Sequence, residues 1–159
     1  MLFSEESYKF MFQALKLAEI AFEEDEVPIG AVVVKDGKII GRGYNQVEKL
    51  NDATAHAEII ALTSASNHLQ SKTLDGCDLY VTVEPCVMCT GAILLSKIKN
   101  LYFATYEPKT GACGSVYNIL DENKLNYKVN IYSGIYETEG KTMIKNYFKM
   151  KRNSKNEKK

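Results

Sequence analysis

The chain has 159 residues, of which 45% are hydrophobic, which suits one compact domain with a real core and excludes a disordered segment. Its net charge is zero, but residues 1–60 carry 11 acidic and 6 basic side chains, whereas residues 61–159 carry 9 acidic and 14 basic ones. No hydrophobic run approaches the roughly 20 residues that span a membrane, and Met1–Phe10 lacks the features of a signal peptide, so we expect a cytoplasmic protein without a membrane partner.

The chain opens with a predicted helix over residues 4–24, for which Ser4 is a suitable N-cap. Its apolar stripe is expected to pack in the core and consists of Tyr8, Met11, Phe12, Leu15, Ala18 and Phe22. The acidic run Glu23-Glu24-Asp25-Glu26 closes this helix and is expected to be a solvated turn.

A hairpin and a second helix follow. Residues 29–34 and 38–44 are predicted to be strands, because Asp36-Gly37 between two apolar runs is a strong turn signal. Residues 55–69 are predicted to be a helix, with Asn51, Asp52 or Thr54 as its cap.

The second half of the chain alternates strands and helices. Residues 79–83 predict a strand buried on both faces, and a helix should run over residues 85–97. Further strands are expected over residues 99–105 and 129–132, and a final helix over residues 137–151.

The C-terminal region separates into a helix and a tail. Four residues of the final helix are expected to face inward: Met143, Ile144, Tyr147 and Phe148. Residues 1–152 are interpreted as a single domain, and residues 153–159 as a basic, flexible tail.

This order predicts an α/β fold with a central five-stranded mixed sheet and helices on both faces, a three-layer α/β/α arrangement. Strands 79–83 and 99–105 should be parallel, because a helix connects them. If helices 55–69 and 85–97 lie side by side on one face, their N-termini meet at the same end of the sheet.

Metal-ligand chemistry is concentrated in the stretch Pro85-Cys86-Val87-Met88-Cys89. If Pro85 lies in the first helical turn, Cys86 and Cys89 project from one face, where the helix dipole favours thiolates. His56 is the best candidate for a third ligand, and a zinc site with three protein ligands keeps a fourth position for water. Cys77 and Cys113 have no metal-type spacing and are interpreted as plain thiols.

Glu58 favours a catalytic over a structural metal site. It lies two residues after His56, where it can accept a proton from a metal-activated water. Alone, Glu58 could equally be a favourable charge at a helix start. His68, late in the same helix, is interpreted as a surface residue.

His56-Ala57-Glu58 followed by Pro85-Cys86-Val87-Met88-Cys89 resembles the known signature of the zinc-dependent nucleoside and nucleobase deaminases. Further stretches resemble, more narrowly, the bacterial tRNA-specific adenosine deaminases, within the cytidine/deoxycytidylate deaminase-like superfamily: residues 26–34, 45, 52–59, 79–89, 109–112, 114–115 and 148–152. The resemblance covers roughly residues 5–152 and implies the cytidine-deaminase-like fold.

The resemblance implies a role for each matching residue. His56, Cys86 and Cys89 would hold one Zn²⁺ per subunit, and Glu58 would shuttle a proton to adenine N1 and then to the departing amine. The substrate would be the wobble adenosine of a tRNA anticodon, typically in an arginine tRNA, and the enzyme a homodimer. The implied substrate contacts are Asn45, the Ala57 backbone, Val27, Pro28, Glu107, Lys109, Phe148 and Arg152. Glu107 stands where the family usually has aspartate, and it would accept a hydrogen bond from a ribose hydroxyl.

Basic side chains near the C-terminus add an electrostatic prediction. Lys141, Lys145, Lys149 and Arg152 recur at helical spacing and could form one stripe that attracts phosphates. The alternative is a lysine-rich solvated terminus.

Two other functions stay open from the sequence. The same metal chemistry would serve a deaminase of free guanine, cytosine or cytidine. A zinc-binding module without catalytic activity, which contacts RNA or protein, is the third reading.

Overall fold

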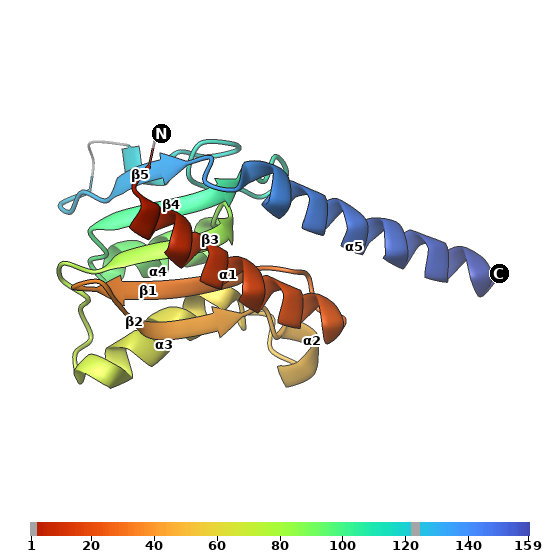
Figure 1. The fold of residues 1–159 in the computed structure, drawn as a ribbon, viewed down its shortest axis with the longest axis horizontal. Coiled ribbons are helices and arrows are strands. Elements are labelled where there is room, and N and C mark those ends of the chain that lie inside the picture. Colours follow the sequence, from red (N-terminus) through yellow and green to blue (C-terminus); the bar gives the residue numbers. More distant parts are fainter. Residues whose placement is uncertain (1–2, 122–124) are drawn as a thin grey trace.

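The computed structural model describes residues 3–121 and 125–159. Its centre is one sheet of order β2-β1-β3-β4-β5 (Figure 1). The strands are β1 (Gly30–Lys35), β2 (Lys38–Tyr44), β3 (Asp78–Val83), β4 (Asn100–Thr105) and β5 (Asn130–Ser133). The helices are α1 (Glu5–Glu23), α2 (Val47–Leu50), α3 (Ala57–Leu69), α4 (Val87–Leu95) and α5 (Glu137–Glu157), with a short 3₁₀ turn at Ile119–Asp121.

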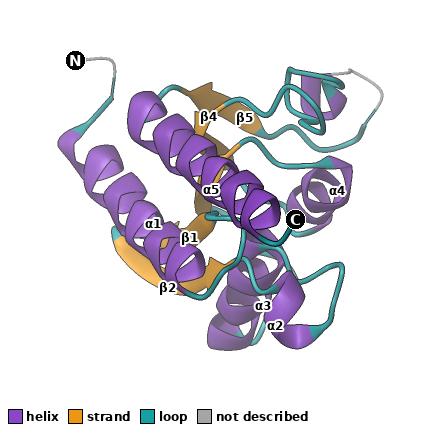
Figure 2. Ribbon diagram, turned by 90° about the vertical axis from the view of Figure 1, so that its right-hand side faces the viewer, coloured by secondary structure: helices purple, strands orange, loops and turns teal. Residues whose placement is uncertain are grey.

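Helices cover both faces of the sheet (Figure 2). Side chains of β4 alternate between the two faces: Leu101 and Phe103 pack in a core with α3 and α4, whereas Ala104 packs in a second core with α1. The start of α5 also packs on the second face, because Gly140 lies against Ala104. The predicted three-layer α/β/α fold with a five-stranded mixed sheet is therefore confirmed.

The strand directions bring four chain segments to one end of the sheet. β1 is antiparallel to both β2 and β3, whereas β3, β4 and β5 are parallel to one another. The parallel pairing of β3 with β4 was predicted. The segment before β1 and the segments after β2, β3 and β4 therefore meet at the same end. In open α/β sheets, this end, beyond the carboxyl ends of the parallel strands, is where ligands bind.

Small residues seat α3 tightly on the sheet. Ala57, Ala61 and Ala65 recur every four residues and are fully buried, so they form one narrow face of the helix. Gly43 on β2 faces this stripe, and a Cβ atom at Gly43 would lie 2.3 Å from the carbonyl oxygen of Ala57. This close approach holds the first turn of α3 against the sheet.

Several local predictions need correction. α3 begins at Ala57 with His56 as its N-cap, and none of the three predicted caps lies there. α2 was not predicted, because a four-residue helix carries too little periodicity to recognise.

The predictions for the two long helices are also wrong in part. Phe12 and Phe148 are exposed rather than inward, whereas Met11 and Tyr147 are buried as expected. α5 continues to Glu157, so the segment 153–159 is mostly helical, although its flexibility stays a prediction. Polar residues can extend a helix that projects into solvent, and the end of α5 does project beyond the body (Figure 1).

Within residues 3–121 and 125–159, none of the helices is long and apolar enough to cross a membrane.

Candidate active site

Three potential metal ligands lie together where α3 and α4 begin. His56 is the N-cap of α3, Cys86 is the N-cap of α4, and Cys89 lies in the first turn of α4. The Nδ1 atom of His56 is 3.6 Å from Sγ of Cys86 and 3.5 Å from Sγ of Cys89. The sequence placed Pro85 and Cys86 inside the first turn, whereas α4 begins at Val87 and both residues precede it.

These separations fit a tetrahedral metal ion. Zinc lies about 2.3 Å from sulfur and about 2.0–2.1 Å from nitrogen, so tetrahedral bond angles place the two donor atoms about 3.6 Å apart. The three donor atoms lie within 4.8 Å of one another, and no fourth histidine, cysteine or acidic residue joins them in the described part of the chain. The group could therefore hold a metal with one position left for another ligand.

The charge states of the ligands are coupled. A hydrogen bond from Cys89 and the contact with His56 lower the pKa of Cys86 to about 4. The pKa of Cys89 is raised by its hydrogen bond to Cys86 and by its burial. The pKa of His56 is raised by its hydrogen bond with Cys86. These contacts favour the thiolate form of Cys86, which is the form that binds metal.

Glu58 lies beside this group and is only 4% exposed. Burial raises the pKa of its carboxyl group, because the charged form loses hydration. A buried carboxylate at a metal centre is the kind of group that exchanges protons with a substrate.

A cavity of about 830 Å³ opens above the group. Its lining includes His56, Glu58 and Cys86. It also includes five of the predicted substrate contacts: Val27, Glu107, Lys109, Phe148 and Arg152. Four basic side chains line it, namely Lys109, Lys145, Lys149 and Arg152, beside three glutamates, Glu58, Glu84 and Glu107. The basic side chains should attract anionic groups of a ligand locally.

A smaller cavity of about 240 Å³ adjoins the first one and shares Val27, Ile29 and His56 with it. Asn45 and Ala57 line the smaller cavity. The Oδ1 atom of Asn45 is buried and finds no hydrogen-bond partner among the described residues, which is costly unless a ligand or water supplies one. A ligand group that donates a hydrogen bond to this Oδ1 atom would therefore be stabilised here.

Other predicted residues lie away from the ligand space. Pro28 is buried and is not among the residues that line these two cavities. His68 is exposed near the other end of α3, as expected. Cys77 and Cys113 are both buried free thiols. Cys113 lies 3.3 Å from the hydroxyl of Thr90, and burial raises the pKa of this thiol to about 12.

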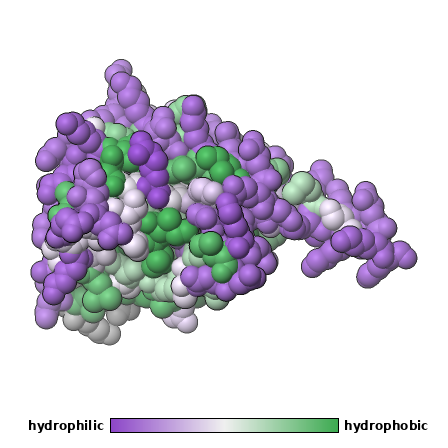
Figure 3. Space-filling model, turned by 90° about the horizontal axis from the view of Figure 1, so that it is seen from below, coloured by the Kyte–Doolittle hydropathy of each residue, from purple (hydrophilic) through white to green (hydrophobic). Residues whose placement is uncertain are grey.

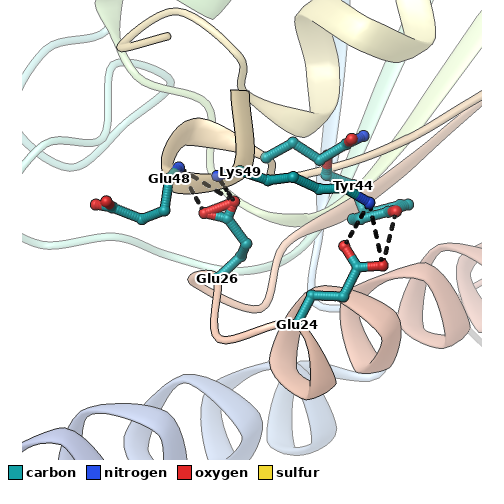
Figure 4. Close-up of polar contacts among 6 residues, drawn as sticks. Glu24, Glu26, Tyr44, Glu48 and Lys49 are labelled. Atoms are coloured by element: carbon teal, nitrogen blue, oxygen red, sulfur yellow. Dashed lines mark hydrogen bonds and ion pairs between the residues drawn. The ribbon is translucent and has the colours of Figure 1, made fainter. Parts of the chain in front are cut away.

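Sequence reasoning missed Glu26, which was assigned to a solvated turn. Its side chain is buried, and its carboxylate accepts hydrogen bonds from the backbone N–H groups of Glu48 (2.7 Å) and Lys49 (3.3 Å), as Figure 4 shows. Its neighbour Glu24 is an exposed partner of Lys49. Glu26 therefore attaches α2 to the segment before β1, and both line the smaller cavity.

We expect Glu26→Ala to lower the free energy of unfolding by about 1–3 kcal/mol, because it removes the acceptor of the part-buried N–H groups of Glu48 and Lys49. Urea unfolding followed by circular dichroism would measure this loss. Glu23→Ala, an exposed change in the same acidic run, is the control and should shift stability by less than about 0.5 kcal/mol. Equal effects of the two changes would contradict this assignment.

Glu84 was the second omission. It is 3% exposed and lies two residues before Cys86, and its carboxylate binds the loop that carries Glu107 and Lys109. The sequence offers no signal for this burial, since glutamate is rarely buried.

The chain is similar to known deaminases over nearly its full length. A model of the MafB19-like deaminase family matches residues 5–152. The tRNA-specific adenosine deaminase of Aquifex aeolicus is 46% identical over 145 residues, which are 91% of this chain and 95% of that protein. A structure from a study of A-to-I editing by tRNA:A34 deaminases at the wobble position of transfer RNA is 44% identical, with a TM-score of 0.82, and the match covers 85% of this chain and 98% of that one. Guanine deaminase from Nitrosomonas europaea is 26% identical, with a TM-score of 0.78, over 92% of this chain and 86% of that one.

Proposed function

The chain belongs to the MafB19-like deaminases and, among them, to the tRNA-specific adenosine deaminases, and we propose that it converts adenosine to inosine at wobble position 34 of a tRNA anticodon. One observation carries the proposal: His56, Cys86 and Glu58 line one cavity together with four basic side chains, here called the basic rim, namely Lys109, Lys145, Lys149 and Arg152. An arginine tRNA is the substrate that the resemblance favours. A tRNA substrate also supports the proposal that the enzyme acts in the cytoplasm.

His56, Cys86 and Cys89 would hold Zn²⁺, which would supply a water of lowered pKa, about 7. Glu58 would accept one proton from the attacking water and pass it to N1 of the adenine ring. As the water oxygen bonds to C6 and the bond from C6 to the exocyclic nitrogen breaks, Glu58 would take the second proton of that oxygen and deliver it to the departing nitrogen. Ammonia leaves, and the base becomes hypoxanthine, so that adenosine becomes inosine.

The smaller cavity supplies a place for the base. A base in a folded anticodon loop must swing out of its stack to reach a buried carboxylate. The side chain of Asn45 would hydrogen-bond the ring edge near N7, and the Ala57 backbone N–H would contact the group at C6. The Nδ2 amide group of Asn45 can donate to N7, whereas its unpartnered Oδ1 atom is an acceptor and would need a donor such as the exocyclic amine of adenine.

A product assay tests the proposed function. Metal-loaded protein is incubated with an anticodon stem-loop that carries adenosine at position 34, and the nucleosides are separated after digestion. We expect inosine. Ammonia released readily from free guanine, with an unchanged stem-loop, would instead favour a free-base deaminase, to which the likeness to guanine deaminase points.

The basic rim predicts how affinity depends on salt. Lys149→Ala and Arg152→Ala should each weaken stem-loop binding and reduce the slope of log K against log salt by about 0.7–1, the effect of one phosphate contact. Fluorescence anisotropy over a salt series measures the slope. Lys72→Ala is the matched control, because Lys72 is exposed and precedes β3, at the opposite end of the sheet from the site. A reduction by Lys72→Ala of the same size would contradict a localised contact.

A second copy of the chain is the proposed partner. Three apolar side chains of α4 are exposed on the helix that carries Cys89: Val87, Met88 and Leu95, the last 80% exposed. A homodimer would cover such a surface. Light scattering should therefore give twice the monomer mass, and a single monomer mass at micromolar concentration would count against the dimer.

A further inference from the structure

Glu84 connects the metal-ligand segment to the loop that forms one wall of the cavity. Its carboxylate accepts hydrogen bonds from the backbone N–H groups of Glu107 (3.0 Å), Cys113 (3.0 Å) and Ser115 (3.1 Å), and from the Ser115 hydroxyl. The two oxygens thus have four donors, all from residues 107–115. A buried carboxylate satisfied in this way is a strong and directional anchor, because hydrogen bonds to a charged acceptor are the stronger kind.

Backbone contacts continue the same attachment. The N–H of Glu84 donates to the carbonyl of Thr105 (2.8 Å), and the N–H of Ala112 donates to the carbonyl of Pro85 (2.9 Å). Gly111 lies directly on the carboxylate, and a Cβ atom there would be 2.3 Å from the carboxyl carbon of Glu84. The loop therefore closes on Glu84 only because residue 111 has no side chain.

The anchored loop carries substrate-facing groups. Glu107, Lys109 and Thr110 line the cavity, and Glu84 itself touches it. The Glu107 carboxylate accepts a hydrogen bond from the backbone N–H of Lys109 (3.0 Å), so the turn is ordered internally as well. Since Cys86 lies two residues from Glu84, the short segment 84–86 positions both a candidate metal ligand and the loop that forms one wall of the cavity.

We propose that Glu84 is a positioning residue, which holds the 107–115 loop at a set distance from the metal-ligand group so that the loop can bind substrate. The inference rests on the proposed function for the identity of the substrate. Glu84 does not touch the reacting atoms in this role, and its effect is exerted through Glu107, Lys109 and the backbone of the loop.

The first test removes one acceptor while keeping the shape. In Glu84→Gln, an NH₂ group replaces one oxygen and faces N–H donors, so one or two loop hydrogen bonds are lost. We expect hydrogen exchange at the amides of Cys113 and Ser115 to quicken by about tenfold or more, with bound metal unchanged. Asp78→Asn is the matched control, since Asp78 is a half-buried carboxylate at the other end of β3, and it should leave these amides unaffected.

Substrate binding is measured apart from the reaction in a Glu58→Ala background. Adding Glu84→Gln should raise the dissociation constant for the stem-loop by about tenfold, the effect of one lost charge-assisted hydrogen bond. In the catalytically active background, the same change should raise KM more than it lowers kcat. If Glu84→Gln fails to fold, Ser115→Ala, which removes only the hydroxyl donor, should shift amide exchange and KM in the same direction by less.

Coupling between Glu84 and Gly111 gives a second test. Gly111→Ala alone should increase loop exchange and KM, because the new methyl group displaces the carboxylate. In a Glu84→Ala background, the same Gly111→Ala change should have little further effect. Additive effects of the two changes would contradict the proposed contact.

Other outcomes would overturn the inference directly. Unchanged amide exchange and unchanged stem-loop affinity in Glu84→Gln would show that the loop holds its place without Glu84. Loss of metal with an unchanged loop would assign Glu84 to the metal centre instead. If the Glu58→Ala protein does not bind the stem-loop at all, the proposed function fails, whereas amide exchange still decides the role of Glu84.

Discussion

Glu58→Gln is expected to lower kcat for inosine formation by about 10²- to 10⁴-fold while the metal stays bound, because positioned general acid–base groups contribute on this order. Glutamine keeps the shape of the buried side chain but cannot accept the proton of the attacking water. The proposed reaction needs this acceptor in the cavity, which Glu58 lines together with His56 and Cys86. Single-turnover rates on the stem-loop measure the loss without interference from product release.

The controls for Glu58→Gln separate catalysis from stability. Glu137→Gln is a matched change in the first turn of another helix, α5, and should leave the rate unchanged. Metal content and stem-loop affinity of Glu58→Gln should match those of the unmodified protein. A Glu58→Gln enzyme that keeps its rate would exclude the proposed proton shuttle and favour the reading as a zinc module without catalytic activity.

Cys89→Ser is expected to lower bound metal from about one ion per chain to near zero and to destabilise the fold. Metal binding to a site formed by folding contributes to folding free energy, and apparent values for structural zinc in small domains are about 10–16 kcal/mol. Cys89 is fully buried in the first turn of α4, so loss of the ion would also leave buried polar groups unsatisfied there. Elemental analysis gives the metal content, and thermal unfolding with and without a chelator gives the stability.

Cys113→Ser is the matched control for Cys89→Ser. Cys113 is a buried thiol near the same site, but it contacts Thr90, and its pKa of about 12 keeps it protonated at neutral pH. Serine can keep the contact with Thr90, so the metal content should stay near one ion per chain. If Cys113→Ser lost the metal as fully as Cys89→Ser, the ligand set would have to include Cys113.

The local parts of the site could be predicted from the sequence. Cys86 and Cys89 are three residues apart and His56 and Glu58 two apart, so each pair shares one helix start whatever the remainder of the fold does. That both pairs meet could be expected from the strand and helix order, and the distances from His56 to the two sulfurs confirm it.

The predictions failed where a side chain's surroundings depend on distant backbone. Glu26 was assigned to solvent because it ends an acidic run. Its hydrogen-bond donors come from α2, a helix too short to be predicted from hydrophobic periodicity. Phe148 was expected to be inward because it is aromatic on a helical stripe, but its side chain is 44% exposed and lines the cavity, where the resemblance had put it among the substrate contacts. Figure 3 shows the projecting end of α5 as largely hydrophilic, as expected for a segment in solvent.

The sequence by itself determined which side chains are the candidate ligands, which carboxylate lies beside them and the layer order, because these follow from short spacings and from the periods of strands and helices. Only the tertiary structure decided which acidic side chains are buried and what they hold. A carboxylate is stable inside a protein only where donors converge on it, and the donors of Glu84 come from residues 23, 29 and 31 positions along the chain. Such convergence of donors arises when separate segments meet at one end of a sheet, and a local sequence pattern cannot predict it.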